Sequence, residues 1–141
     1  MSPLPNGFEP HFRKSAVTDP WEPLYSRRSE GLVELGVMLA PAHCNSRGFV
    51  HGGVIATLAD NAMGLSLGAA RSEQRIVDEK PASALTISLS VDYAASAKVG
   101  QWLQITPRVV KAGRSMGFVD ALVTADGSIV ARASATFRVV S

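Results

Sequence analysis

The sequence predicts an α+β domain in which one long helix packs against an antiparallel sheet of about five strands. Three observations support this prediction. A mostly apolar segment opens at Gly52-Gly53 and continues to about Ala70, which is typical of a helix. Segments before and after it alternate apolar and polar residues, as strands with one buried face do. Asp126-Gly127 is a strong hairpin signal, and hairpins join antiparallel strands.

The expected elements follow in order along the chain. Residues 1–30 are rich in proline and have no hydrophobic period, which predicts an N-terminal arm held to the body by its aromatic side chains. The domain itself is predicted to span 31–141. Its expected elements are a strand at 32–39, a loop at 42–50, a helix at about 52–70, a polar loop at 71–82, and strands at 85–93, 102–111, 118–124 and 129–139.

Alternation within the strands assigns side chains to faces. In the strand at 85–93, the polar face is predicted to hold Thr86, Ser88, Ser90 and Asp92. In the last strand, the apolar face is predicted to hold Ile129, Ala131, Ala133, Ala135, Phe137 and Val139.

The length and composition limit what the chain can be. The 141 residues suffice for one compact domain. Charged residues make up only 18%, against about 25% in ordinary globular chains, which indicates that part of the surface is covered in an oligomer. A hydrophobic fraction of 46% excludes disorder. The net charge of +2 is spread along the chain and gives no nucleic-acid footprint.

The single cysteine, Cys44, excludes an intrachain disulfide and a zinc site built on several thiolates. The first residues carry neither a basic cluster nor an apolar run, so the expected compartment is the cytoplasm. The three histidines, His11, His43 and His51, lack the ligand spacing of a metal site, so no metal is expected. Cys44 beside His43 is better interpreted as a small buried residue than as a nucleophile.

The helix is apolar nearly all round. At 100° per residue, the stripe predicted to lie on the sheet consists of Val54, Ile55, Leu58, Ala62, Leu65 and Ala69. The opposite side holds Ala56, Asp60, Met63 and Leu67. Because one sheet is expected to cover only one side, a second subunit is predicted to cover the other.

Asp60 is the main candidate for chemistry. It is the only ionisable residue between His51 and Arg71, in a helix predicted to be mostly buried. A carboxylate in such a place is either a functional group or a structural one that is hydrogen-bonded in a solvent-filled notch. The residues themselves leave both interpretations open.

His51 and two glycines open the helix. Free N–H groups at a helix N-terminus suit a developing oxyanion, although an ordinary loop-to-helix turn would also explain the glycines. Asn45 upstream is either part of this site or a turn residue. His51 and Asp60 are roughly 13.5 Å apart along the helix and about 180° around it. If both serve one site, that site lies between two copies of the chain.

The spacing Asn45-x-x-Gly48-x-x-His51-Gly52-Gly53-x6-Asp60, followed by Asn61-Ala62, resembles hotdog-fold acyl-CoA thioesterases of the phenylacetate-degradation (PaaI-like) branch. The resemblance spans roughly residues 32–140 and includes the strand end at Tyr93 and the segments 97–100 and 111–114.

This resemblance implies a central helix wrapped by about five to six antiparallel strands, and a dimer with sheets joined edge to edge. It implies hydrolysis of acyl-CoA to free acid and coenzyme A, without a metal or redox cofactor. Asp60 of the opposite subunit would be the general base or nucleophile, and the Gly52 N–H would bind the thioester oxygen. His51 and Asn45 would support that donor, and Thr86 would position the water or the carboxylate.

The sequence also suggests residues that bind coenzyme A, a larger oligomer and alternative functions. Lys111 and Arg114, and also Arg75 or Lys80, could bind the phosphates of coenzyme A or could be ordinary solvated charges. The homodimer is expected to pair again into a dimer of dimers. The alternatives are a hotdog hydratase or dehydratase, disfavoured by the Asn45, His51 and Asp60 set, and a non-catalytic acyl-CoA-binding module. A Ser–His–Asp hydrolase is disfavoured because no Gly-x-Ser-x-Gly elbow exists.

Overall fold

The computed structural model describes residues 4–74 and 83–140. Its strands are β1 (Glu9–Pro10), β2 (Tyr25–Ser29), β3 (Leu32–Met38), β4 (Ser83–Tyr93), β5 (Trp102–Ala112), β6 (Met116–Ala125) and β7 (Ser128–Val140). Its helices are α1 (Gly52–Gln74) and two short 3₁₀ helices, η1 (Asp19–Trp21) and η2 (Pro41–His43). The predicted α+β class is therefore confirmed.

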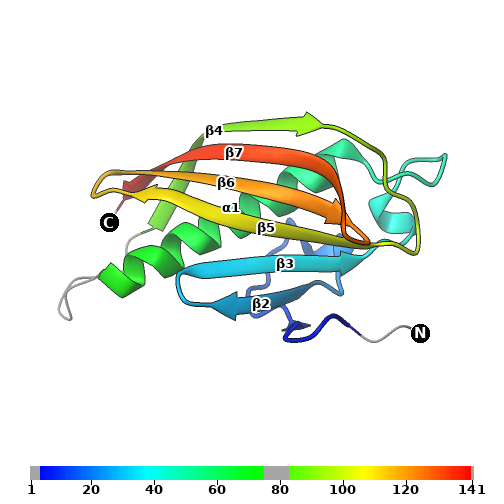
Figure 1. The fold of residues 1–141 in the computed structure, drawn as a ribbon, viewed down its shortest axis with the longest axis horizontal. Helices are drawn as coiled ribbons and strands as arrows, with labels where there is room; N and C mark the ends of the chain where they lie inside the picture. The colour runs from blue at the N-terminus through cyan, green and yellow to red at the C-terminus, as the bar shows by residue number, and fades with distance from the viewer. Residues whose placement is uncertain (1–3, 75–82, 141) are drawn as a thin grey trace.

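The strands form one antiparallel sheet in the order β1-β2-β3-β5-β6-β7-β4 (Figure 1). Its seven strands exceed the predicted five to six, because two short strands of the N-terminal arm extend the sheet beyond β3. Alternation is hard to see in β2, whose sequence YSRRS is mostly polar, as suits a strand near a sheet edge. The predicted boundary between arm and domain falls in the turn between β2 and β3.

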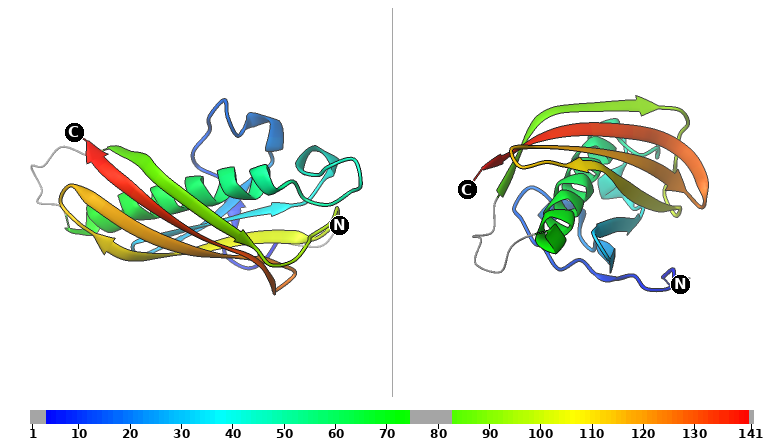
Figure 2. Two further views of the ribbon diagram at one scale, coloured as in Figure 1. Left: turned by 90° about the horizontal axis from the view of Figure 1, so that it is seen from above. Right: turned by 60° about the vertical axis from the view of Figure 1, so that its left-hand side comes forward.

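The sheet curls around α1, which lies between the sheet and the segment of the N-terminal arm that connects β1 to β2 (Figure 2). The core consists of this interface, with Leu58, Met63 and Leu67 fully buried on the helix and Leu35, Ile105 and Val123 fully buried on the strands. The helix is four residues longer than the predicted end at Ala70, so Arg71–Gln74, predicted as loop, are helical. The rest of that predicted loop, 75–82, lies outside the described residues.

The prediction of which helix face meets the sheet was wrong in part. Met63 and Leu67 are predicted to lie on the side that a second subunit covers, but both are 0% exposed within one subunit. Leu65, which is predicted to lie on the sheet, is only half-buried. A curled sheet covers more than one side of a helix, which explains the difference. Gly117 of β6 makes room for Leu67, since a Cβ at that position would collide with the Leu67 side chain.

The last hairpin confirms the Asp-Gly signal and corrects one face assignment. Asp126 and Gly127 have φ angles of 48° and 86°, as a primed turn requires. The register then shifts between Val123 and Thr124, so Val130 is buried while Ile129 is 55% exposed. One extra residue in a strand moves the following side chains to the other face, which strict alternation cannot predict.

Aromatic residues of the arm attach it to the body, as predicted for this segment. The Phe8 ring is buried and meets the Trp102 ring edge-to-face, with centroids 5.2 Å apart. Gly36 of β3 leaves the space in which the Trp102 ring lies. The arm also reaches α1, where His11 Nε2 lies 3.2 Å from Asn61 Oδ1.

Candidate active site

The Asp60 carboxylate on α1 is held by the sheet. Thr86 of β4 donates its hydroxyl hydrogen to Asp60 Oδ1 at 2.7 Å. Asp60 is half-buried and Thr86 is exposed, so this pair lies at the surface of one subunit, which is less burial than the sequence predicts. A carboxylate fixed through one oxygen keeps its second oxygen for a water or a substrate.

A β-bulge directs Thr86 toward the helix. The register of β4 against β7 shifts between Thr86 and Ser88, so Thr86 lies opposite the buried Phe137 and Ser88 lies opposite Thr136. The prediction that Thr86 shares the polar face with Ser88 was therefore wrong. Bulges redirect side chains in this way, and without the extra residue Thr86 would point away from Asp60.

The N-terminus of α1 carries the second group of candidates. Gly52 is the first helical residue, and its N–H has no acceptor among the described residues. The exposed His51 caps the helix, because its Nδ1 accepts the Gly53 N–H at 2.9 Å. In the neutral imidazole this leaves the proton on Nε2, which points a donor away from the helix end.

Tyr93, at the end of β4, completes this group. Its hydroxyl donates to the Gly52 carbonyl oxygen at 2.5 Å, and a Cβ on Gly52 would lie 3.1 Å from the ring carbon Cζ. Sequence reasoning noted Tyr93 only as a strand end. No spacing in a single sequence indicates that this ring would reach the helix start, 41 residues away along the chain.

Asn45 has the structure of a turn residue. Its Oδ1 accepts the N–H groups of Arg47 and Phe49 at 2.9 and 3.2 Å. These bonds shape the loop that leads to His51, and they leave the side-chain amide hydrogens free to face a ligand. The geometry is thus compatible with Asn45 as a turn residue and also with Asn45 as part of the site.

Within one subunit, the Asp60 carboxylate and the helix N-terminus at Gly52 do not lie together. Gly52 and Asp60 are eight residues apart on a continuous helix, hence roughly 12 Å along its axis. No contact joins His51 to Asp60 among the described residues. This separation agrees with the spacing argument made from the sequence.

The two candidates for phosphate binding are far from the helix start. Lys111 and Arg114 are exposed at the turn between β5 and β6. The Arg71 side chain in the last turns of α1 donates to the carbonyl of Gly113, which places this turn at the opposite end of the helix from Gly52. Arg75 and Lys80 lie outside the described residues.

The remaining histidines and Cys44 have structural environments. His43 is buried between the Ala40 N–H, which its Nδ1 accepts, and the Trp21 carbonyl oxygen, 2.9 Å from its Nε2. Partial burial raises the pKa of the Cys44 thiol and so disfavours the thiolate that a nucleophile needs. Within 4–74 and 83–140, no cluster of three metal-ligating side chains occurs.

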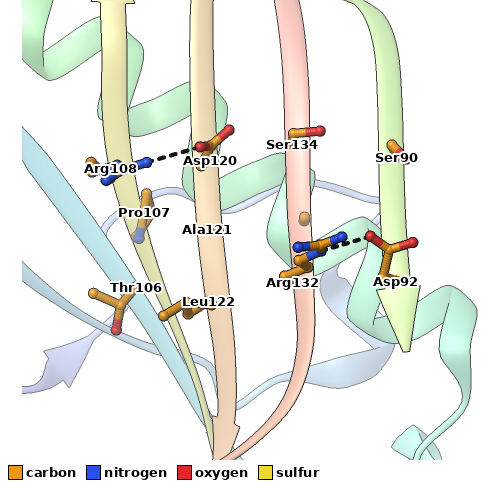
Figure 3. Close-up of a pocket in the computed structure, with 11 residues that line it drawn as sticks. Ser90, Asp92, Thr106, Pro107, Arg108, Asp120, Ala121, Leu122, Arg132 and Ser134 are labelled. Atoms are coloured by element: carbon orange, nitrogen blue, oxygen red, sulfur yellow. Dashed lines mark hydrogen bonds and ion pairs between the residues drawn. The ribbon is translucent and has the colours of Figure 1, made fainter. Parts of the chain in front are cut away.

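A cavity of about 540 Å³ lies on the outer face of the sheet, away from α1 and from these residues (Figure 3). Its lining includes two ion pairs, Arg108 with Asp120 at 3.2 Å and Arg132 with Asp92 at 2.8 Å. Neither Asp60 nor Gly52 lines it. In the described part of the chain, no helix is long and apolar enough to cross a membrane.

Comparison with known proteins gives the family. The thioesterase superfamily matches residues 47–132. Over 139 residues, covering 98% of both chains, the sequence is 33% identical to "Putative esterase PA0474" of Pseudomonas aeruginosa. It is 32% identical to human acyl-coenzyme A thioesterase 13 over 92 residues, which make up 64% of this chain and 60% of that protein.

A Streptococcus mutans protein solved with bound acetyl CoA has the same fold. Its TM-score is 0.69 at 32% identity, over 80% of this chain and 84% of that one. The chain belongs to the thioesterase superfamily, with the hotdog fold, and is a thioester hydrolase. The resemblance inferred from the motif is therefore confirmed for the superfamily, the fold and the hydrolysis of thioesters.

Proposed function

We propose that this hydrolase cleaves acyl-coenzyme A thioesters at a site shared between two subunits. The observation that carries the proposal is the position of the Asp60 carboxylate, which is held by Thr86. It lies on the same helix as the Gly52 N–H, which has no acceptor among the described residues, but too far from it for both to reach one substrate within one subunit. The substrate class is supported by the human relative named an acyl-coenzyme A thioesterase and by the streptococcal relative with bound acetyl CoA. The motif spacing supports the PaaI-like branch.

In the proposed reaction, the thioester carbonyl oxygen accepts the Gly52 N–H at the positive end of α1. Asp60 of the second copy either takes a proton from a water that adds to the carbonyl carbon, or adds to that carbon itself. The C–S bond then breaks. The thiolate leaves without strong acid assistance, since a thiol has a pKa of about 8.5. In the second route, water hydrolyses the resulting anhydride.

The edge strand β4 supports the sharing of the site. It pairs with β7 on one side and is the last strand of the described sheet on the other. Its side chains Leu85 and Ile87 are 57% and 54% exposed, which is unusual for an edge strand of a free monomer. A second β4 added in antiparallel fashion would continue the sheet, cover these residues and bring another α1 beside Asp60.

The outer face of the sheet supports a further pairing into a dimer of dimers. Across β5, β6, β7 and β4, Arg108, Asp120, Arg132 and Asp92 form a diagonal row of alternating charge, with the second ion pair two residues further along the strands (Figure 3). In a second copy related by a twofold axis, this row runs in the opposite direction, so each charge can face one of opposite sign. Phe118 is 41% exposed on this face, so Phe118→Lys should convert a tetramer into dimers in light scattering. A wild-type chain that is dimeric at working concentration would contradict this pairing.

Lys111 and Arg114 remain candidates for the phosphates of coenzyme A. They lie beyond the C-terminal end of α1, and only a second subunit could bring them near a Gly52 N–H. If they bind these phosphates, Lys111→Ala and Arg114→Ala will raise KM for acyl-CoA more than for a short thioester that lacks the nucleotide.

A panel of acyl-CoA substrates assayed with a thiol-detecting reagent tests the function. Asp60→Asn keeps the shape of the side chain and is expected to lower kcat by about 10²-fold or more. Asp19→Asn in η1 removes an exposed aspartate that belongs to neither proposed site nor proposed interface and serves as the control. Absence of turnover on every acyl chain would point to a binding module or another thioester reaction, and unchanged turnover in Asp60→Asn would refute the role of Asp60.

A further inference from the structure

We propose that Tyr93 is a positioning residue that fixes the Gly52–Gly53 peptide and so restrains the backbone of Gly52, whose own N–H lies in the adjoining peptide. The inference rests on the proposed function, in which that N–H binds the thioester oxygen. Its geometric basis is the 2.5 Å hydrogen bond from the Tyr93 hydroxyl to the Gly52 carbonyl oxygen.

The helix start needs such an anchor. Gly52 and Gly53 have no Cβ and therefore more backbone freedom than any other residue pair. They also form the first turn of α1, where N–H groups lack acceptors inside the helix and ends fray. A donor that stabilises an oxyanion is effective only when it is already oriented before charge develops.

Among the described residues, three side-chain hydrogen bonds reach these two glycines, and only the one from Tyr93 comes from outside the helix and its cap. His51 Nδ1 accepts the Gly53 N–H at 2.9 Å, and Thr57 Oγ1 donates to the Gly53 carbonyl at 2.9 Å. Both partners belong to the same stretch of chain and would move with it. Among the described residues, Tyr93 therefore provides the side-chain hydrogen bond that connects these two glycines to the sheet.

The Tyr93 ring also explains why position 52 holds glycine. A Cβ there would lie 3.1 to 3.3 Å from three atoms of the ring, including the hydroxyl oxygen. The helix start can thus approach the ring closely enough for the hydrogen bond. Tyr93 and Thr86 belong to the same strand, so β4 orients both the helix N-terminus and the Asp60 carboxylate.

The test compares Tyr93→Phe, which removes only the hydroxyl, with Tyr25→Phe, which removes the hydroxyl of the other tyrosine, a residue of β2 whose ring lies near Trp102. We expect Tyr93→Phe to lower kcat for acyl-CoA about tenfold and to leave KM within about twofold, because the ring stays and only donor alignment is lost. Tyr25→Phe should change neither.

Amide hydrogen exchange at Gly53, followed by NMR in the free protein, gives a readout that does not depend on activity. It should become about fivefold faster in Tyr93→Phe, the effect of losing one hydrogen bond, and stay unchanged in Tyr25→Phe. Unchanged kcat and unchanged Gly53 exchange would overturn the role of Tyr93. If the wild-type chain cleaves no acyl-CoA, the proposed function fails, and the exchange measurement still decides whether Tyr93 fixes this peptide.

Discussion

Thr86 on β4 donates a 2.7 Å hydrogen bond to Asp60 on α1, across 26 residues of sequence. The bond exists because a bulge after Thr86 turns its side chain from the outer face of the sheet to the helix side. It leaves the second oxygen of the carboxylate free of this bond, and it connects α1 to β4, the strand at the edge of the sheet.

Thr86→Val is expected to lower kcat by about 10- to 100-fold, since a hydrogen bond to a charged group contributes about 1.5–3 kcal/mol. Valine keeps the shape but cannot donate, whereas Thr86→Ser retains the hydroxyl and should recover most of the activity. Thr136→Val, on the outer face of β7, is the matched control. Equal rates for Thr86→Val and the wild type would show that the bond has no role in turnover.

Mixing two inactive variants tests whether subunits share the site. Asp60→Asn lacks the carboxylate. The double variant Gly52→Pro with Tyr93→Ala lacks the Gly52 N–H, because proline is tolerated at a first helical position and removal of the Tyr93 ring gives the proline side chain room. After equal amounts are unfolded and refolded together, half of the dimers should be mixed, each with one intact site. Activity should then recover to about one quarter of the wild type. No recovery, with mixed dimers confirmed by mass spectrometry, would place each site within one subunit.

His11 should make stability depend on pH. Burial lowers its pKa below the ordinary value of about 6.5, and the Asn61 hydrogen bond and Glu22 oppose this only partly, while Lys14 and Arg13 add to it. Below pH 6.5 the unfolded chain therefore binds a proton that the folded chain does not. The free energy of unfolding should fall on acidification until the folded-state pKa is passed.

Urea unfolding at a series of pH values measures this dependence. His11→Gln removes the titrating group, so the stability lost between pH 7 and 5 should be smaller than in the wild type. An identical pH profile for the variant would show that His11 has an ordinary pKa in the folded protein.

Two substitutions on α1 test which helix face the sheet covers. Met63→Ala should reduce the free energy of unfolding by about 2–5 kcal/mol, because it opens a cavity in a fully buried position. Leu65→Ala, at a half-buried position, should cost less than half as much. Chemical denaturation at low protein concentration provides the comparison, and the reverse order would support the face predicted from the sequence.

The sequence predicted well what depends on neighbours along the chain. Its alternation located the four long strands β4, β5, β6 and β7 as well as β3, and Asp126-Gly127 correctly indicated a primed turn. The helix start at Gly52 also agrees with the structure, since two glycines after a capping histidine are a local signal. The motif from Asn45 to Asp60 indicated the superfamily for the same reason, because its residues lie within one loop and one helix.

The tertiary structure alone decided which side chains meet. A helix that is apolar nearly all round does not specify its rotation, so the burial of Met63 depended on how far the sheet curls. A bulge of one residue reverses the face of a side chain, so the alternation that predicts Thr86 on the polar face with Ser88 fails at this point of β4. Tyr93 reaches Gly52 for the same kind of reason, since contacts between residues far apart in sequence depend on packing and leave no local pattern.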